Sequence, residues 1–141
     1  MPPKKHRLRV VIDTSALVSA LWGGIYLQII NLWKHGHLQL IVSADIVEEY
    51  LRVLEKLGVQ PLRLEGWAKW FQHPSKVSVV RPGIKYQICR DPNDDMFLDA
   101  AVAGRAKYII ARDADLIDME SFRGIKIVTP QQFIKLMNST L

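Results

Sequence analysis

The chain has 141 residues, of which 49% are hydrophobic, and a formal net charge of +5 with a pI of about 9.5. This length fits a single domain, residues 1–141, and the hydrophobic content excludes an intrinsically disordered chain. No apolar run approaches the ~18–20 residues of a membrane span, and the apolar stretch Leu8–Ile12 is too short for a secretory leader. A lone cysteine, Cys89, excludes an internal disulfide and suits a reducing cytoplasm.

Short apolar segments alternate with amphipathic ones along the chain. The apolar segments are rich in β-branched residues without a strict polar alternation, as is typical of strands covered on both faces. Strands are predicted at Leu8–Asp13, Leu38–Ser43, Lys76–Val80, Lys107–Ala111 and Ile125–Val128. Helices are predicted over 14–22, 26–36, 43–58, 61–72, 93–105, 114–119 and 129–137. Capping residues are expected at Thr14 or Ser15, at Ser43 and at Asn93.

This order of elements predicts an α/β fold, a three-layer α/β/α sandwich with a mainly parallel sheet of about five strands. Residues 1–7 are expected to form a basic N-terminal arm. Ligands of such sheets bind beyond the carboxyl ends of the strands. Asp13 ends the first strand and Asp113 follows the fourth. Both side chains are therefore expected at the same edge of the sheet.

Two further acids occupy unusual positions on the predicted helices. At about 100° per residue, Glu49 borders the apolar arc of its helix, whereas Glu48 falls on the polar side, four residues before Arg52. We expect Glu48 to face solvent in an ion pair with Arg52. In the helix over 93–105, Asp94 projects into the apolar arc.

The neighbours of Asp94 show no such inward position. Asp95 and Asp99 are predicted to lie one turn apart on the outer flank of that helix. Substitution of Asp95 is therefore expected to change little.

Four carboxylates near a core would repel one another unless they were protonated or neutralised. Each acid alone also fits a helix cap or a surface ion pair. Together, Asp13, Glu49, Asp94 and Asp113 match the oxygen ligands that Mg²⁺ or Mn²⁺ prefers. An acidic metal site in a basic chain is typical of a metal-dependent nuclease, because lysine and arginine hold the polyanion that the cation helps to cleave.

Three segments in order, "VVIDTSALVSAL", "SADIVEEYLRVL" and "DPNDDMFLDAAVAGRAKYIIARDADL", resemble the successive motifs of the PIN-domain family. The resemblance extends from about Arg9 to Pro130, and it is strongest to prokaryotic toxin-like PIN proteins related to VapC. It implies a cytoplasmic, Mg²⁺- or Mn²⁺-dependent ribonuclease that acts on single-stranded RNA. It also implies a possible antitoxin partner and a homodimer.

The resemblance assigns roles residue by residue. It places the family's catalytic and metal-binding acids at Asp13, Glu49, Asp94 and Asp113, with Glu49 counted from Ser43. Asp115 stands where an auxiliary metal-binding acid often occurs. Ser15 and Arg112 are candidates for substrate binding.

One departure from the family pattern keeps a second function open. Ala111 stands where the family usually has Thr or Ser at the end of the fourth strand, so a hydroxyl that could orient water is missing. The alternative is a non-catalytic RNA-binding or assembly module. A haloacid-dehalogenase-like phosphatase would need a second aspartate where Ser15 stands, and a response-regulator receiver would need a different order of acids.

The tryptophans divide by context. Trp33 and Trp70 lie at helical spacing among apolar residues and are predicted to be core. Trp22 and Trp67 are next to glycines and are candidates for base stacking or dimer packing.

Overall fold

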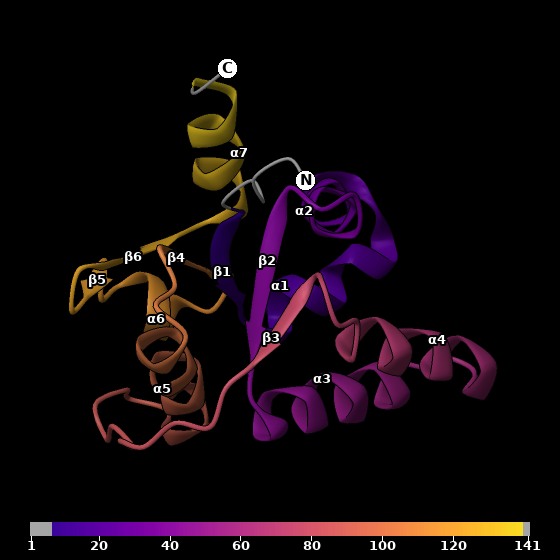
Figure 1. Ribbon diagram of the computed structural model, residues 1–141, viewed down its shortest axis with the longest axis horizontal. Helices are drawn as coiled ribbons and strands as arrows, with labels where there is room; N and C mark the ends of the chain where they lie inside the picture. The colour runs from indigo at the N-terminus through magenta and orange to yellow at the C-terminus, as the bar shows by residue number, and fades with distance from the viewer. Residues whose placement is uncertain (1–6, 140–141) are drawn as a thin grey trace, which may run out of the picture.

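The computed structural model describes residues 7–139 and has a central sheet between helices (Figure 1). Most of the predicted basic arm lies outside the described residues. Its last residue, Arg7, packs against the domain instead of extending from it. The Arg7 guanidinium donates hydrogen bonds to the Ser75 carbonyl and, at 3.4 Å, to the Gln39 side chain.

The sheet has six strands in the order β3-β2-β1-β4-β6-β5, and every pairing is parallel except that of β5 with β6. The prediction of an α/β fold with a mainly parallel sheet is confirmed. Five strands match the predicted positions, and β5 was not predicted. The strands are β1 (Leu8–Ile12), β2 (Leu38–Val42), β3 (Val77–Val79), β4 (Tyr108–Ile110), β5 (Ser121–Phe122) and β6 (Ile125–Val128).

Two of the predicted helices are each divided into a 3₁₀ turn and an α-helix. The helices are α1 (Thr14–Val18), η1 (Ser19–Trp22), α2 (Gly24–Lys34), α3 (Ala44–Lys56), α4 (Pro61–Phe71), η2 (Pro92–Asp94), α5 (Asp95–Ala103), α6 (Ala114–Ile117) and α7 (Pro130–Ser139). Ser43 caps α3 as predicted, since its hydroxyl accepts from the Ile46 amide. The other predicted caps were wrong, because aspartates outcompete them: Asp13 caps α1 and Asp91 caps η2.

The helices cover both faces of the sheet. Figure 1 shows α5 and α6 on one side, with α2 and α4 on the other. On the first side α5 packs against β1, β2 and β4, whereas α3 packs between α1 and α4. Right-handed connections between parallel strands require this arrangement, because the chain reverses direction across the sheet after β3. The reversal brings the ends of β1 and β4 together at the middle of the sheet.

Apolar side chains fill both layers between the sheet and the helices. Val10, Ile41 and Ile109 are fully buried in the central strands. Trp33 of α2 is also fully buried, with its indole N–H donating to the Lys76 carbonyl at 3.0 Å, so its predicted core position is confirmed. Trp70 is half-buried and meets the Trp33 ring edge-on.

Within residues 7–139, no single helix has the length and apolar character needed to cross a membrane. The pair Thr14–Trp22 and Gly24–Lys34 meets that requirement by length and composition only, and the two parts are bent by 105°. Residues of both parts, such as Leu17 and Trp33, belong to the buried core.

Candidate metal and substrate site

Asp13 stands at the carboxyl end of β1 and is almost fully buried. One carboxylate oxygen accepts from the Ala16 amide at 2.7 Å, which caps α1. The other accepts from the amides of Arg112 and Asp113, at 3.0 Å each, just beyond β4. Burial raises the pKa of Asp13, and these three backbone hydrogen bonds partly oppose that rise. The side chain therefore joins the ends of two neighbouring strands while it faces the site.

A cavity of about 420 Å³ opens at this edge of the sheet. We call it the acid cavity, because Asp13, Glu49, Asp94 and Asp113 all line it. The strand ends supply two of these acids, η2 supplies Asp94 and α3 supplies Glu49. Ser15 and Arg112, the two candidates for substrate binding, also line it. Sequence reasoning did not place Asp91 and Asn93 there, and both line the cavity too.

Asp94 has the least satisfied carboxylate of the acid cavity. Its side chain is buried, and Oδ2 has no hydrogen-bond partner among the described residues. Burial raises its pKa to about 7, with the negative charges of Asp113, Asp91, Asp13 and Asp115 adding to the effect. A buried carboxylate oxygen without a donor is costly unless a proton or a cation neutralises it.

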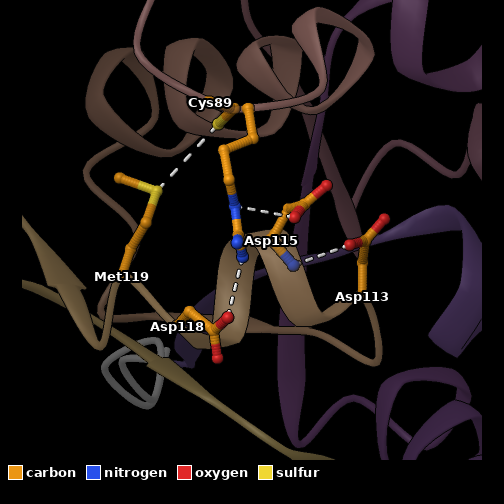
Figure 2. Close-up of polar contacts among 6 residues, drawn as sticks. Cys89, Asp113, Asp115, Asp118 and Met119 are labelled. Carbon is orange, nitrogen blue, oxygen red and sulfur yellow. Dashed lines mark hydrogen bonds and ion pairs between the residues drawn. The ribbon is translucent and has the colours of Figure 1, made fainter.

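Asp94, Asp113 and Asp115 each have one carboxylate oxygen within 4.8 Å of those of the other two. Asp113 caps α6, and one of its oxygens accepts from the Asp115 amide at 2.8 Å, as Figure 2 shows. Oxygen ligands at this spacing, one of them without a donor, fit a hard divalent cation. The acidic cluster is thus consistent with a divalent metal site.

Glu49 and Glu48 behave partly as predicted. Glu48 is exposed, whereas Glu49 is half-buried at the rim of the acid cavity. The predicted ion pair of Arg52 was assigned to the wrong neighbour, because both Glu49 oxygens accept from Arg52 Nη2 at 2.9 Å. Spacings of three and four residues both allow such a pair, and the negative field of the cavity favours a cation beside Glu49.

The predicted outer flank of α5 is not exposed. Asp95 and Asp99 are both buried. One Asp95 oxygen accepts from the amides of Ile88 and Cys89, at 3.1 and 2.9 Å, and Asp99 accepts from the Tyr86 amide at 2.7 Å. The segment that leads into η2 covers this flank, and the two aspartates hold it. The prediction that Asp95 and Asp99 lie on an exposed outer flank was therefore wrong.

A family model for the PIN domain matches residues 9–115 of the chain. The chain belongs to the PIN-domain family. Uncharacterized protein MJ1680 of Methanocaldococcus jannaschii is 29% identical, over 94% of this chain and 93% of that protein. The crystal structure of Mycobacterium tuberculosis VapC20, described as a sarcin–ricin loop cleaving toxin, matches with a TM-score of 0.55 at 14% identity. That match covers 83% of this chain and 98% of VapC20, and it confirms the PIN-like fold.

The one departure from the expected family pattern lies at the end of β4, next to the acid cavity. Ala111, where the family usually has a hydroxyl, is fully buried. The next residue, Arg112, is exposed and donates from Nη1 to the Ser15 hydroxyl at 3.2 Å. The guanidinium therefore lies at the rim of the acid cavity, beside Ser15.

Arg90 is a site residue that sequence reasoning missed. Its Nε lies 2.9 Å from an Asp115 oxygen, and its Nη2 lies 2.7 Å from an Asp118 oxygen. Figure 2 shows both ion pairs, beside the contact of the Cys89 thiol with the Met119 sulfur at 4.0 Å. More than twenty positions separate Arg90 from these acids, so no local pattern indicated the contact.

Two further polar groups complete the surroundings of Asp13. The buried Tyr50 hydroxyl of α3 donates to the Ile12 carbonyl at the end of β1. Thr14 Oγ1 is buried without a hydrogen-bond partner among the described residues.

Proposed function

We propose that this PIN-domain protein is a Mg²⁺- or Mn²⁺-dependent endoribonuclease that cleaves single-stranded RNA. One observation carries the proposal: the buried Asp94 carboxylate has an oxygen without a donor, and it lies beside the carboxylates of Asp113 and Asp115. A fixed cluster of this kind costs folding energy unless it serves a cation. The basic balance of the chain supports a polyanionic substrate.

Asp94, Asp113 and Asp115 would hold the cation, with Asp13 and Glu49 completing the acidic wall. A divalent cation bound there would neutralise phosphate oxygens and lower the pKa of water to give a nucleophile at neutral pH. Asp94, with a pKa of about 7, would lose its proton when the cation binds.

The remaining side chains of the acid cavity would bind the substrate or hold the acidic residues in place. The backbone hydrogen bonds to Asp13 fix its carboxylate between two strand ends. Arg52 fixes Glu49 in the same way through its ion pair. Arg112, which donates to Ser15 at the rim, would bind a substrate phosphate.

The likeness to VapC20, the sarcin–ricin loop cleaving toxin, supports the proposal that this protein belongs to a toxin–antitoxin pair. Its partners would then be RNA and an antitoxin protein, and it would act in the cytoplasm as a homodimer.

A specific observation favours the second candidate, a non-catalytic RNA-binding or assembly module. Ala111 removes the expected hydroxyl, and Arg90 already neutralises Asp115 through an ion pair. Such a protein would bind RNA without cutting it.

A cleavage assay on mixed single-stranded RNA with Mg²⁺ or Mn²⁺ separates the two candidates. We expect metal-dependent cleavage by the wild type and a loss of roughly 100-fold or more in Asp94→Asn. Glu48→Gln, an exposed acid next to Glu49, is the matched control and should retain activity. If neither the wild type nor Asp94→Asn cuts under any divalent metal, and both bind RNA alike, the module is the function.

A further inference from the structure

A second cavity, of about 580 Å³, lies between η1, α2 and α4. We call it the aromatic groove, and its defining residues are Trp22, Lys34, Arg63, Trp67 and Trp70. Trp22 lines both this groove and the acid cavity. The two hollows therefore adjoin at the end of η1. In Figure 1, α2 and α4 lie on the same side of the sheet.

Trp22 is unusually exposed for its type, with 70% of its surface accessible. It ends η1 immediately before Gly23, whose φ of 81° turns the chain into α2. Most tryptophans bury much of their ring, and an exposed one at the mouth of a cavity is typical of a binding surface. Its indole face is available to a planar group.

The inner part of the groove combines aromatic rings with cations. Trp67 and Trp70 are half-buried, and Lys34 Nζ lies 5.0 and 5.2 Å from their ring centroids. Arg63 is exposed on the facing side of α4. Neither Lys34 nor Arg63 belongs to an ion pair among residues 7–139.

The two cations line the same groove. Burial lowers the pKa of Lys34, and the positive charge of Arg63 lowers it further. Two converging cations without a carboxylate partner form a site for an anion. The acid cavity carries negative charge and would repel an anionic strand. Such a strand would therefore need cations in the groove that leads to the cavity, as well as a cation in the cavity itself.

We propose that the aromatic groove binds the single-stranded RNA that enters the acid cavity, with one base stacked on Trp22 and the adjoining phosphates held by Lys34 and Arg63. This inference rests on the proposed ribonuclease function. Alternating aromatic faces and cations are what single-stranded nucleic acids require, because every base offers a π-face and every linkage carries a charge. A wholly apolar partner segment would leave both cations desolvated without a counter-charge.

The test measures the affinity of a fluorescein-labelled decauridylate RNA by anisotropy in EDTA, followed by cleavage of the same RNA in Mn²⁺. We expect Trp22→Ala to weaken binding by about 5- to 100-fold, because it removes one stacking platform. Trp22→Phe should restore most of that affinity. Arg63→Ala should reduce the slope of log affinity against log salt by about one.

Two matched controls share α4 with Arg63. Leu62 is 81% exposed and Lys69 is exposed, and both lie outside the groove lining. Leu62→Ala and Lys69→Ala should bind and cut RNA as the wild type does. Circular dichroism and thermal melts establish that every variant is folded.

The outcomes distinguish this inference from the proposed function. A wild type that binds RNA but cuts it under no divalent metal overturns the nuclease alone. If the wild type cuts RNA and the groove variants bind it with unchanged affinity, the proposal for the aromatic groove alone is overturned. The groove would then suit a protein segment instead of RNA. Equal losses in the groove variants and the α4 controls also overturn the proposal.

Discussion

Adjacent aspartates of one short stretch have opposite environments. Asp95 accepts two backbone hydrogen bonds from Ile88 and Cys89, whereas a buried oxygen of Asp94 has no donor among the described residues. Burial raises the pKa of both carboxyls, but the backbone donors lower that of Asp95 overall, whereas that of Asp94 rises to about 7. For these two neighbours, the amide donors that Asp95 has and Asp94 lacks account for the opposite directions of the pKa shifts.

The same difference divides the rest of the acidic stretch. Asp99 belongs with Asp95, because it accepts from the Tyr86 amide and holds the segment before η2. Asp113 and Asp115 belong with Asp94, because their carboxylates converge with it. One group therefore holds the segment before η2 through backbone hydrogen bonds, and the other is tolerated at the cost of repulsion. The basic chain concentrates acid here for two separate reasons.

Metal binding to the group of Asp94, Asp113 and Asp115 should have the largest of the expected effects. Mn²⁺ at about 100 times its Kd should raise the free energy of unfolding by about 2.7 kcal/mol, or roughly 5–10 °C in Tm, because it binds the folded cluster only. Asp94→Asn should lose most of this shift, whereas Glu48→Gln should retain it. Thermal melts in EDTA and across a Mn²⁺ titration give the measurement. Equal melting temperatures at all concentrations would exclude a functional metal site.

In the metal-free protein, neutralising Asp95 should lower the free energy of unfolding, whereas neutralising Asp94 should not. Asp95→Asn should lower the free energy of unfolding by about 1–2 kcal/mol, because the amides of Ile88 and Cys89 lose a charged acceptor. Asp94→Asn should be neutral or stabilising, since it removes repulsion. Urea denaturation in EDTA compares the two variants. A larger loss in Asp94→Asn than in Asp95→Asn would reverse the assignment of the two groups.

The strands were predictable from sequence, whereas the packing of the segment before η2 was not. Val10 and Ile41 belong to short, β-branched apolar runs that are typical of strands covered on both faces. β5, at Ser121–Phe122, is too short to leave a pattern and depends on pairing with β6. Asp95 was misplaced because helical periodicity predicts the direction of a side chain but not which other segment covers that side chain.

The acid cavity was predictable where strand ends and helix arcs fixed a position. Asp13 and Asp113 follow neighbouring parallel strands, so topology alone brings them together. Arg90 was missed because its contacts depend on how the segment before η2 packs against α6. Trp22 was recognised as a candidate for stacking, but its place between two cavities required the structure.

The pH dependence of the stability of the metal-free protein also reports on the environment of Asp94. The folded pKa of Asp94, about 7, exceeds its unfolded value of 3.8, so the folded state holds this proton more tightly. The stability that this proton contributes is fully present below about pH 3.8 and is lost as the pH rises through 7.

Between pH 5 and 8 in EDTA, the wild type should therefore lose about 1 kcal/mol or more relative to Asp94→Asn. Urea denaturation at several pH values measures the difference between the two proteins, which cancels the titration of other groups. Parallel pH profiles for the two proteins would show that Asp94 ionises normally.

The smallest expected effect concerns Arg90. Its exposed guanidinium neutralises Asp115, which lies in the acidic cluster but faces a cation already. Arg90→Ala should free that carboxylate and strengthen Mn²⁺ binding by about two- to fivefold, since exposed ion pairs are weak and screened by salt. Isothermal titration calorimetry at low and high salt measures the change, with Arg123→Ala, an exposed arginine outside the cluster, as the control. Weaker Mn²⁺ binding in Arg90→Ala would mean that the arginine positions Asp115 for the cation, which would place Asp115 with the fixed aspartates and leave Asp94 and Asp113 as the open pair.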